Sequence, residues 1–506
     1  MATAVAQQPH HLFFRVTLGT QAKAAVSGRV LVFLSEGTGA KEVDDNPFSP
    51  KPVYVAAKEV THLEPGASVD VDTDDLAYPQ GFSTLRPGDY QAQAVLDTQH
   101  TYDYAGRAAG DLISSVIPLK NWTAGQGDEP SLVLSDAVPE RAPRVTLTPE
   151  QEKAAHAEDF VSPVLSKFFG RPVHMRAWVI VPPGYENNLK ERYLTAYWTH
   201  GFGATLAYCK ASGAGIYTRM AEGKMPPMIW VMLDESWATG THEFADSLNN
   251  GPWGAALTAE FIPYLEAKYR MNGTVHGRFL QGHSSGGWAT LQLQVNYPGI
   301  FGGTWSTSPD PSDFHDFTGV DLYAPHANLY HRPDGTPYPL VRDHEKVLGT
   351  FEQFAKLERV LGDYGGQLGS FEWVFSPRGA DGQPLRMFNR DTGDVNPDVV
   401  AYWRDHYDLA HRVGEEWAAR GSQLRGKIHV FVGTADTFYL DGAAHKFDAV
   451  LRGLNANARF TYVDNRTHFD LYKVGDDRGG LFDQIGAEMW AAGHGGQQWK
   501  PKVVSR

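Results

Sequence analysis

The sequence predicts an all-β, sandwich-like domain at residues 10–145, followed by an α/β domain at residues 170–495. Two observations predict this division. The first part holds short β-rich runs separated by Gly, Pro and Asp turns. From about residue 170, short apolar strands alternate with helical segments, which is typical of a mostly parallel sheet with helices on both faces. A chain of 506 residues has room for both domains.

The expected strands of the N-terminal domain are short and half buried. Alternate positions from Tyr90 to Leu96 are apolar or small, which is the period of a strand with one face in a core. Several such strands within one domain favour a β-sandwich. This domain offers no candidate nucleophile, base or acid. The expected strands occupy residues 12–17, 30–34, 53–56 and 90–96.

The second domain follows a segment, residues 146–169, that we assign as a linker. Its expected strands are apolar without alternation, as burial on both faces requires. A helical stretch at 255–269 contains Pro263, which should kink or split it. Residues 310–425 interrupt the strand–helix rhythm, and we interpret them as an insertion. The expected strands are 177–181, 194–198, 229–233, 279–280, 302–305, 428–432 and 460–463.

The composition excludes several function classes. The formal net charge of −14 disfavours binding to nucleic acid or to anionic lipid. The single cysteine, Cys209, excludes an intrachain disulfide and a thiolate zinc cluster. No apolar run approaches the roughly 18 residues of a membrane helix. Residues 4–8 (AVAQQ) resemble the end of a signal-peptide cleavage site, so periplasmic or secreted is favoured over cytoplasmic.

A nucleophile motif lies at Gly282-His283-Ser284-Ser285-Gly286. A strand precedes this G-x-S-x-G and a helix follows it, so Ser284 should sit on a tight turn with its hydroxyl projecting from the sheet. The glycines allow the strained turn and close packing. The competing interpretation is a Ser/Gly-rich turn that merely opens a helix. Ser285 is a minor rival because it does not occupy the central position.

A serine hydroxyl needs a base to become nucleophilic. In this strand–turn–helix arrangement the chain order is Ser, acid, His. His468 follows the last expected strand, and Asp436 follows the strand before it. We therefore predict His468 as the base and Asp436 as the acid that orients it. Asp441 is the alternative acid, and His445 fits the base position less well.

The oxyanion of the reaction needs backbone N–H donors. Ser285 should supply one donor from the start of the helix. The loop Thr199 to Gly203 follows the strand 194–198, and Phe202 with Gly203 are the expected second donors. The alternative is a glycine-rich turn without a ligand.

Together these motifs resemble the α/β-hydrolase branch that contains esterase D, the enterochelin-type esterases and the feruloyl esterases. The resemblance covers about 170–495 and rests on His200-Gly201-Phe202-Gly203, Asn250-Gly251-Pro252-Trp253-Gly254, the Ser284 motif and His468. It implies ester hydrolysis through an acyl-enzyme without metal or cofactor. A β-domain ahead of such a domain is similar to the enterochelin-esterase arrangement. The large insertion departs from the compact family pattern.

The remaining candidates concern the substrate. Glu235 and Asp310 follow expected strands and are candidates for binding a polar or cationic substrate. His200 and Trp253 are further candidates for substrate contact, although buried aromatic residues more often belong to a core. The histidines of the insertion lack metal-ligand spacing, so no metal is expected.

Three functions remain open. The first is a serine esterase acting on a small-molecule ester. The second is a serine peptidase or acyltransferase on the same fold, because an acyl-enzyme can pass its acyl group to water, an amine or an alcohol. The third is a binding protein with a vestigial hydrolase fold. We expect the insertion to set substrate choice by lining the cleft. The alternative is that it only stabilises the domain.

Overall fold

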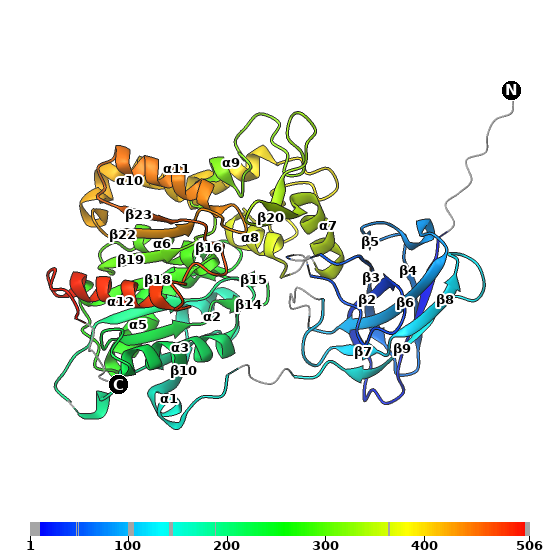
Figure 1. The fold of residues 1–506 in the computed structure, drawn as a ribbon, viewed down its shortest axis with the longest axis horizontal. Coiled ribbons are helices and arrows are strands. Elements are labelled where there is room, and N and C mark those ends of the chain that lie inside the picture. The colour runs from blue at the N-terminus through cyan, green and yellow to red at the C-terminus, as the bar shows by residue number, and fades with distance from the viewer. Residues whose placement is uncertain are drawn as a thin grey trace. The chain divides into compact units, whose positions relative to one another are not determined.

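A computed structural model describes residues 11–46, 48, 50–99, 106–140, 145–187, 189–362 and 365–500. The expected cleavage-site pattern at residues 4–8 lies outside these residues. The chain divides into two compact units (Figure 1). The first holds residues 1–142, 238–240 and 348–369, and the second holds 143–237, 241–347 and 370–506. Among the described residues, no helix has the length and apolar character needed to cross a membrane.

The described strands of the first unit form one nine-stranded sheet. Its order is β4 (Ser68–Asp72), β1 (Phe13–Leu18), β9 (Ser131–Ala137), β7 (Leu112–Ser114), β6 (Gly88–Asp97), β2 (Val26–Glu36), β3 (Val53–Leu63) and β5 (Ala77–Tyr78), with β8 (Ile117–Trp122) paired to β6. The β-rich character predicted for the N-terminal region is confirmed.

Both faces of this sheet are apolar, which explains why residues 30–34 form an unbroken apolar run. Val30 and Val32 of β2 belong to one core, whereas Leu31 and Phe33 belong to another on the opposite face. The second core is completed by helix α7 (Phe351–Gly362), which contributes Leu357, Val360 and Leu361. Residues 348–369, predicted as part of an insertion in the α/β domain, therefore group with the β-rich unit.

The second unit is built on a mixed sheet of eight described strands. Its order is β10 (Ala155–Val161), β11 (His174–Ile180), β13 (Ile229–Leu233), β12 (Thr195–Thr199), β18 (Arg278–His283), β19 (Gly303–Thr307), β22 (Ile428–Gly433) and β23 (Arg459–Val463). The strands from β13 to β23 run parallel to one another. β11 runs antiparallel to both of its neighbours, β10 and β13. The predicted α/β class with a mostly parallel sheet is confirmed.

The central strands are buried on both faces. Trp230 and Met232 of β13 point into a core shared with helices α3 (Leu206–Ala221) and α12 (Gly480–Gly493), whereas Val231 points into the opposite core. The opposite core includes Leu293 of α6 (Ser285–Asn296). Helices thus cover both faces, as the continuous apolar runs predict.

One predicted boundary differs in the structure, and one predicted break in a helix is confirmed. Residues 146–169, predicted as a linker, form α1 (Pro149–Ala154), β10 and α2 (Pro163–Phe169), and β10 adds an edge strand to the sheet. The predicted helix 255–269 is divided into α4 (Trp253–Ala256), a π-helical turn (Leu257–Phe261) and α5 (Ile262–Lys268). Pro263 lies in the first turn of α5, where its missing N–H costs nothing.

The remaining elements connect these layers. They are the hairpin β20 (Pro339–Asp343) and β21 (Lys346–Thr350), the helices α8 (Gln367–Phe375), α9 (Pro397–Tyr407), α10 (Leu409–Leu424) and α11 (Leu440–Gly453), the short strands β14 (Ser236–Trp237), β15 (Gly240–Thr241), β16 (Asp246–Ser247) and β17 (Gly251–Pro252), and the 3-10 turns Phe82–Thr84, Tyr185–Asn187, Val275–Gly277 and Phe314–Asp316.

Candidate active site

Ser284 lies in a strained turn between β18 and α6. Its φ of 61° and ψ of −126° are unusual for a residue with a side chain. The backbone holds it there: its N–H donates to the Thr307 carbonyl at 3.0 Å, and its own carbonyl accepts from the Trp288 N–H at 3.0 Å. The geometry is that of a nucleophile elbow, in which strain is compensated by the surrounding sheet and helix.

The glycines of the motif are required by close backbone approaches. A Cβ at Gly282 would lie 2.1 Å from the Gly286 carbonyl oxygen. A Cβ at Gly286 would lie 2.4 Å from the carbonyl oxygen of His200. No side chain fits at either position, so the spacing G-x-S-x-G follows from packing of the turn on itself and on the loop after β12.

Asp436 and His468 form a buried pair at the carboxyl edge of the sheet. His468 Nδ1 lies 3.0 Å from Asp436 Oδ2, and the two side chains are 4% and 0% exposed. Burial opposes the charge on Asp436, but the His468 ring and the Phe438 N–H outweigh it and lower the pKa of the carboxyl. The alternative acid, Asp441, pairs instead with Arg342 at 3.0 Å.

His468 lies beside the elbow. Its ring centroid is 4.5 Å from that of His283, the residue before Ser284. Burial and the neighbouring His468 lower the pKa of His283 to about 3, so His283 stays neutral and does not compete as a base. No hydrogen bond joins the side chains of Ser284 and His468. Such bonds often tighten only when substrate binds.

The loop after β12 packs against Ser284. A Cβ at Gly201 would lie 3.0 Å from Ser284 Cβ and 3.6 Å from its Oγ. The Ala204 N–H donates to the Gly201 carbonyl, which closes a turn with Phe202 and Gly203 at its centre. Gly203 has φ +78°, the value that favours glycine at this position. The predicted oxyanion residues therefore occupy a turn next to Ser284, and Ser285 opens α6.

His200 is a fully buried part of this loop. Its Nδ1 donates to the Gly201 carbonyl at 2.8 Å, and its Nε2 accepts from the Glu235 N–H at 3.1 Å. The ring thus ties the turn after β12 to the loop after β13. Predicted for substrate contact, His200 is placed by the structure as a support of the turn.

Trp253 also lies away from solvent. It is 2% exposed, belongs to the core under the sheet, and donates its indole N–H to the Asn250 carbonyl at 2.7 Å. Its ring stacks on His242 with centroids 3.6 Å apart. In this structure Trp253 is a packing residue.

Acidic side chains gather around the elbow. Asp310 follows β19, and its Oδ2 accepts from the Ser285 hydroxyl at 2.6 Å. Burial raises the pKa of Asp310 to about 6, and burial raises that of Glu235 to about 8. Glu243, which no sequence motif indicated, has its pKa raised well above its usual range by burial and by the charges of Asp310 and Glu235.

Arg342 of β20 was not predicted either. Its Nε donates to the carbonyl of Asp436 at 2.8 Å, and its Nη2 donates to Asp441. The backbone N–H of Arg342 also donates to the Thr437 carbonyl at 2.9 Å. The hairpin β20–β21 therefore supports the loop that bears the predicted acid.

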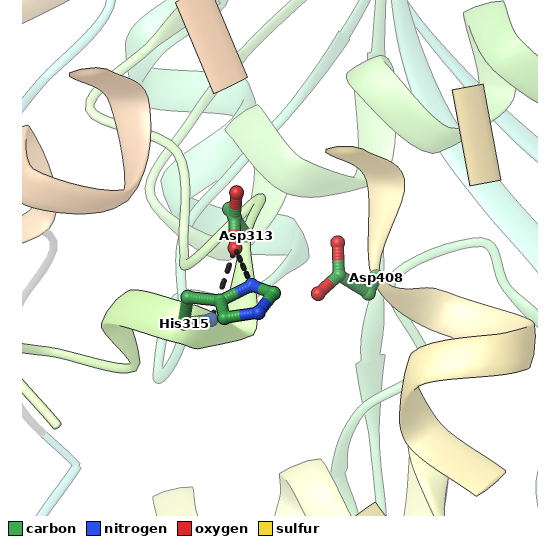
Figure 2. A group of neighbouring side chains, drawn as sticks. All are labelled: Asp313, His315 and Asp408. Carbon is green, nitrogen blue, oxygen red and sulfur yellow. Dashed lines mark hydrogen bonds and ion pairs between the residues drawn. The ribbon is translucent and has the colours of Figure 1, made fainter. Parts of the chain in front are cut away.

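One group of side chains has metal-ligand spacing. Asp313, His315 and Asp408 offer ligand atoms within 4.8 Å of one another (Figure 2). Both carboxylates already serve as helix caps: Asp313 accepts from the His315 N–H, and Asp408 accepts from the N–H groups of Phe314 and His411. Capping accounts for this cluster.

Comparisons with known proteins give the family of this chain. The sequence profile of the family described as Putative esterase matches residues 167–504, more than half of the chain. No curated protein sequence matches. Solved structures that resemble the chain include a ferulic acid esterase from Anaeromyces mucronatus in complex with ferulic acid (13% identity, 69% of this chain and 93% of that one, TM-score 0.36). Another is an S-formylglutathione hydrolase from Agrobacterium tumefaciens (14%, 67% and 94%, TM-score 0.37). The chain therefore belongs to the Putative esterase family of ester-hydrolysing enzymes.

Proposed function

We propose that this chain cleaves carboxylic esters through an acyl-enzyme formed on Ser284, with His468 as base and Asp436 as the acid that orients it. The observation that carries the proposal is the strained Ser284 turn beside the buried Asp436–His468 pair. A residue held at such φ and ψ is found where function requires it.

In the first half of the reaction, His468 takes the Ser284 hydroxyl proton as Oγ attacks the ester carbonyl carbon. The negative charge that develops on the carbonyl oxygen is received by backbone N–H groups of Phe202 or Gly203 and of Ser285. The ester C–O bond then breaks, and the alcohol leaves with the proton from His468. Water repeats the sequence and releases the acid.

The test is Ser284→Ala with a matched neighbour, Ser285→Ala. We expect Ser284→Ala to lose on the order of 10⁴-fold or more in kcat on p-nitrophenyl acetate and to lose labelling by a fluorophosphonate. Ser285→Ala should keep the label, because its backbone N–H remains. Circular dichroism checks folding of both variants. Label on a folded Ser284→Ala protein would contradict the proposal.

The same assay separates the alternatives. A vestigial binding protein would take no label. A peptidase would also cleave an aminoacyl anilide, which an esterase leaves intact. An acyltransferase would give transfer products when an alcohol acceptor is added. We expect hydrolysis of the ester to dominate.

A further inference from the structure

The elbow is surrounded by acidic side chains that lack basic partners. Asp310, Glu235 and Glu243 are 4%, 0% and 1% exposed. Among the described residues, none of the three pairs with a lysine or arginine. Both carboxyl oxygens of Glu235 and Oε2 of Glu243 have no hydrogen-bond partner at all. Buried polar atoms in this condition are rare in native proteins and call for a ligand or a proton.

The nearby arginines pair with other carboxylates. Arg176 lies 3.4 Å from Asp234, and Arg342 pairs with Asp441. Asp436 already pairs with His468. Among the described residues, no lysine or arginine pairs with Asp310. A charge on His468 would lower the pKa of Asp310, but His468 must be neutral to act as the base.

The charges of these acids affect one another's pKa values. The charge of Asp310 raises the pKa of both Glu235 and Glu243, in addition to the larger effect of burial. Asp310 has a pKa of about 6 and Glu235 of about 8, so at neutral pH Asp310 is ionised while Glu235 keeps its proton. The negative charge of the set is therefore concentrated on Asp310, the member that contacts the elbow.

Asp310 lies where the substrate must react. Its side chain accepts from the Ser285 hydroxyl, and its backbone N–H donates to the carbonyl of Ser284 at 3.2 Å. Because Ser284 Oγ must bond to the ester carbon, a group that contacts Asp310 belongs to a part of the substrate close to that carbon. A negative charge on Asp310 would also attract a positive charge carried by the substrate.

We propose that the preferred esters carry an ammonium group close to the ester bond, and that Asp310 receives this group. The proposal rests on the proposed ester hydrolysis and names its substrate class. The ammonium supplies the counter-charge that the protein lacks at this point, and the partly unsatisfied carboxyls of Glu235 and Glu243 keep the surroundings favourable to a cation.

The experiment compares each cationic ester with a neutral ester of the same shape. One pair varies the alcohol: 2-(trimethylammonio)ethyl acetate against 3,3-dimethylbutyl acetate. The other varies the acyl group: p-nitrophenyl 4-(trimethylammonio)butanoate against p-nitrophenyl 5,5-dimethylhexanoate. The quantity measured is the ratio of kcat/KM within a pair, in the parent protein and in Asp310→Asn. Dividing the two ratios cancels the intrinsic reactivity of the esters.

We expect the parent ratio to exceed that of Asp310→Asn by about tenfold or more in at least one pair, with Asp310→Glu between them. Asp398→Asn removes one exposed negative charge on α9 and should leave the ratio unchanged. If Asp310→Asn fails to fold, competitive inhibition of the parent by choline and by 3,3-dimethylbutanol decides. Choline should inhibit at the lower concentration.

The outcomes separate this inference from the proposed function. Equal ratios in both pairs, with normal turnover of the neutral esters, would overturn the cation preference and leave ester hydrolysis standing. Absence of turnover on every ester, with no fluorophosphonate label, would overturn both.

Discussion

At the scale of single residues, the elbow combines two kinds of constraint. Ser284 is strained, and the glycines around it are set by backbone atoms that leave no room for a Cβ. The strain at Ser284 and the Gly282 contact are local to the motif, which is why its spacing in the sequence already predicts the turn. The Gly286 contact is with the loop after β12. The positions of the acidic side chains are different, because they depend on where distant loops meet.

The approach of Gly201 to the nucleophile gives a first prediction. In Gly201→Ala, the new Cβ would lie 3.0 Å from Ser284 Cβ and 3.2 Å from the His283 carbonyl oxygen. The turn that bears Phe202 must shift by a few tenths of an ångström to relieve this contact. We expect kcat on p-nitrophenyl acetate to fall about 10- to 100-fold with KM little changed, because oxyanion donors act on the transition state.

The control is Gly215→Ala in the exposed face of α3, where nothing lies within 4 Å of the new Cβ. This variant should keep full activity and gain about 0.5–1 kcal/mol of stability from helix propensity. Unchanged kcat in Gly201→Ala would mean that the loop after β12 takes no part in catalysis.

The raised pKa of Glu235 gives a second prediction, on stability. The folded protein holds this proton up to a pH of about 8, whereas the unfolded chain releases it near its ordinary value of 4.5. Between these values the unfolded state binds fewer protons, so the free energy of unfolding falls as pH rises. Glutamine resembles the neutral carboxyl and does not titrate, so the stability of Glu235→Gln should not fall with pH for this reason.

We therefore expect the free energy of unfolding of Glu235→Gln to rise relative to that of the parent as the pH increases from about 4.5 to 8. The rise is about 1.4 kcal/mol per pH unit at most. Urea unfolding at pH 5, 6, 7 and 8 measures the difference. A gap that stays constant across this series would show that Glu235 is ionised in the folded protein.

At the scale of elements, the hairpin β20–β21 matters most for the candidate site. It belongs to the region predicted as an insertion, and it brings Arg342 to the loop of Asp436. Arg342→Ala removes the donors to the Asp436 carbonyl and to Asp441. We expect about a tenfold loss of kcat with KM little changed, because the acid loop would no longer hold the His468 ring in one orientation.

Arg342 acts through the loop and does not touch the reacting atoms, so the pH–rate profile is the diagnostic measurement. In Arg342→Ala the pH–rate profile should shift relative to that of the parent, and Arg342→Lys should restore part of the activity. A fall in activity with an unmoved profile, in step with a lower melting temperature, would point to a general structural role.

Most elements of the sheet could be predicted from the sequence, because strands buried on both faces leave an unbroken apolar run. β10 was missed for the opposite reason: it is an edge strand that carries Glu158, whose charge is matched by Lys268 and two tyrosines from α5 and its C-cap. Residues 399–420 carry one amphipathic pattern, but the structure divides them at Asp408, which caps α10. Amphipathic spacing continues across the break, so periodicity did not reveal it.

The candidate site shows the same division. Ser284, Asp436 and His468 each follow a strand, and parallel strands bring their carboxyl ends to one edge of the sheet. Arg342 and Glu243 carry no such signal, since Arg342 reaches Asp436 across 94 residues of chain. The contact of Arg342 with Asp436 is visible only once the position of the hairpin β20–β21 in the fold is known.

At the scale of the whole molecule, the segment predicted as one insertion serves two units. Helix α7 closes a core of the β-rich unit with Leu357, Val360 and Leu361. Phe375 of α8 instead packs on Trp288 of α6, with ring centroids 4.7 Å apart. The expectation that the whole insertion sets substrate choice is therefore narrowed to its parts in the second unit, and it stays a prediction.

The last prediction uses two buried leucines as a matched pair, one in each unit. Leu357 of α7 and Leu451 of α11 are both 1% exposed. Replacing either by alanine should cost about 2–5 kcal/mol in the unit that contains it, from lost burial and the cavity left behind. Leu357→Ala should lower the stability of the β-rich unit and leave the temperature at which activity is lost nearly unchanged. Leu451→Ala should lower that temperature. Calorimetry of the full chain, with residual activity measured after heating, distinguishes the two. If both variants shifted the loss of activity equally, α7 would be coupled to the catalytic unit as strongly as α11 is, and the two units would unfold as one.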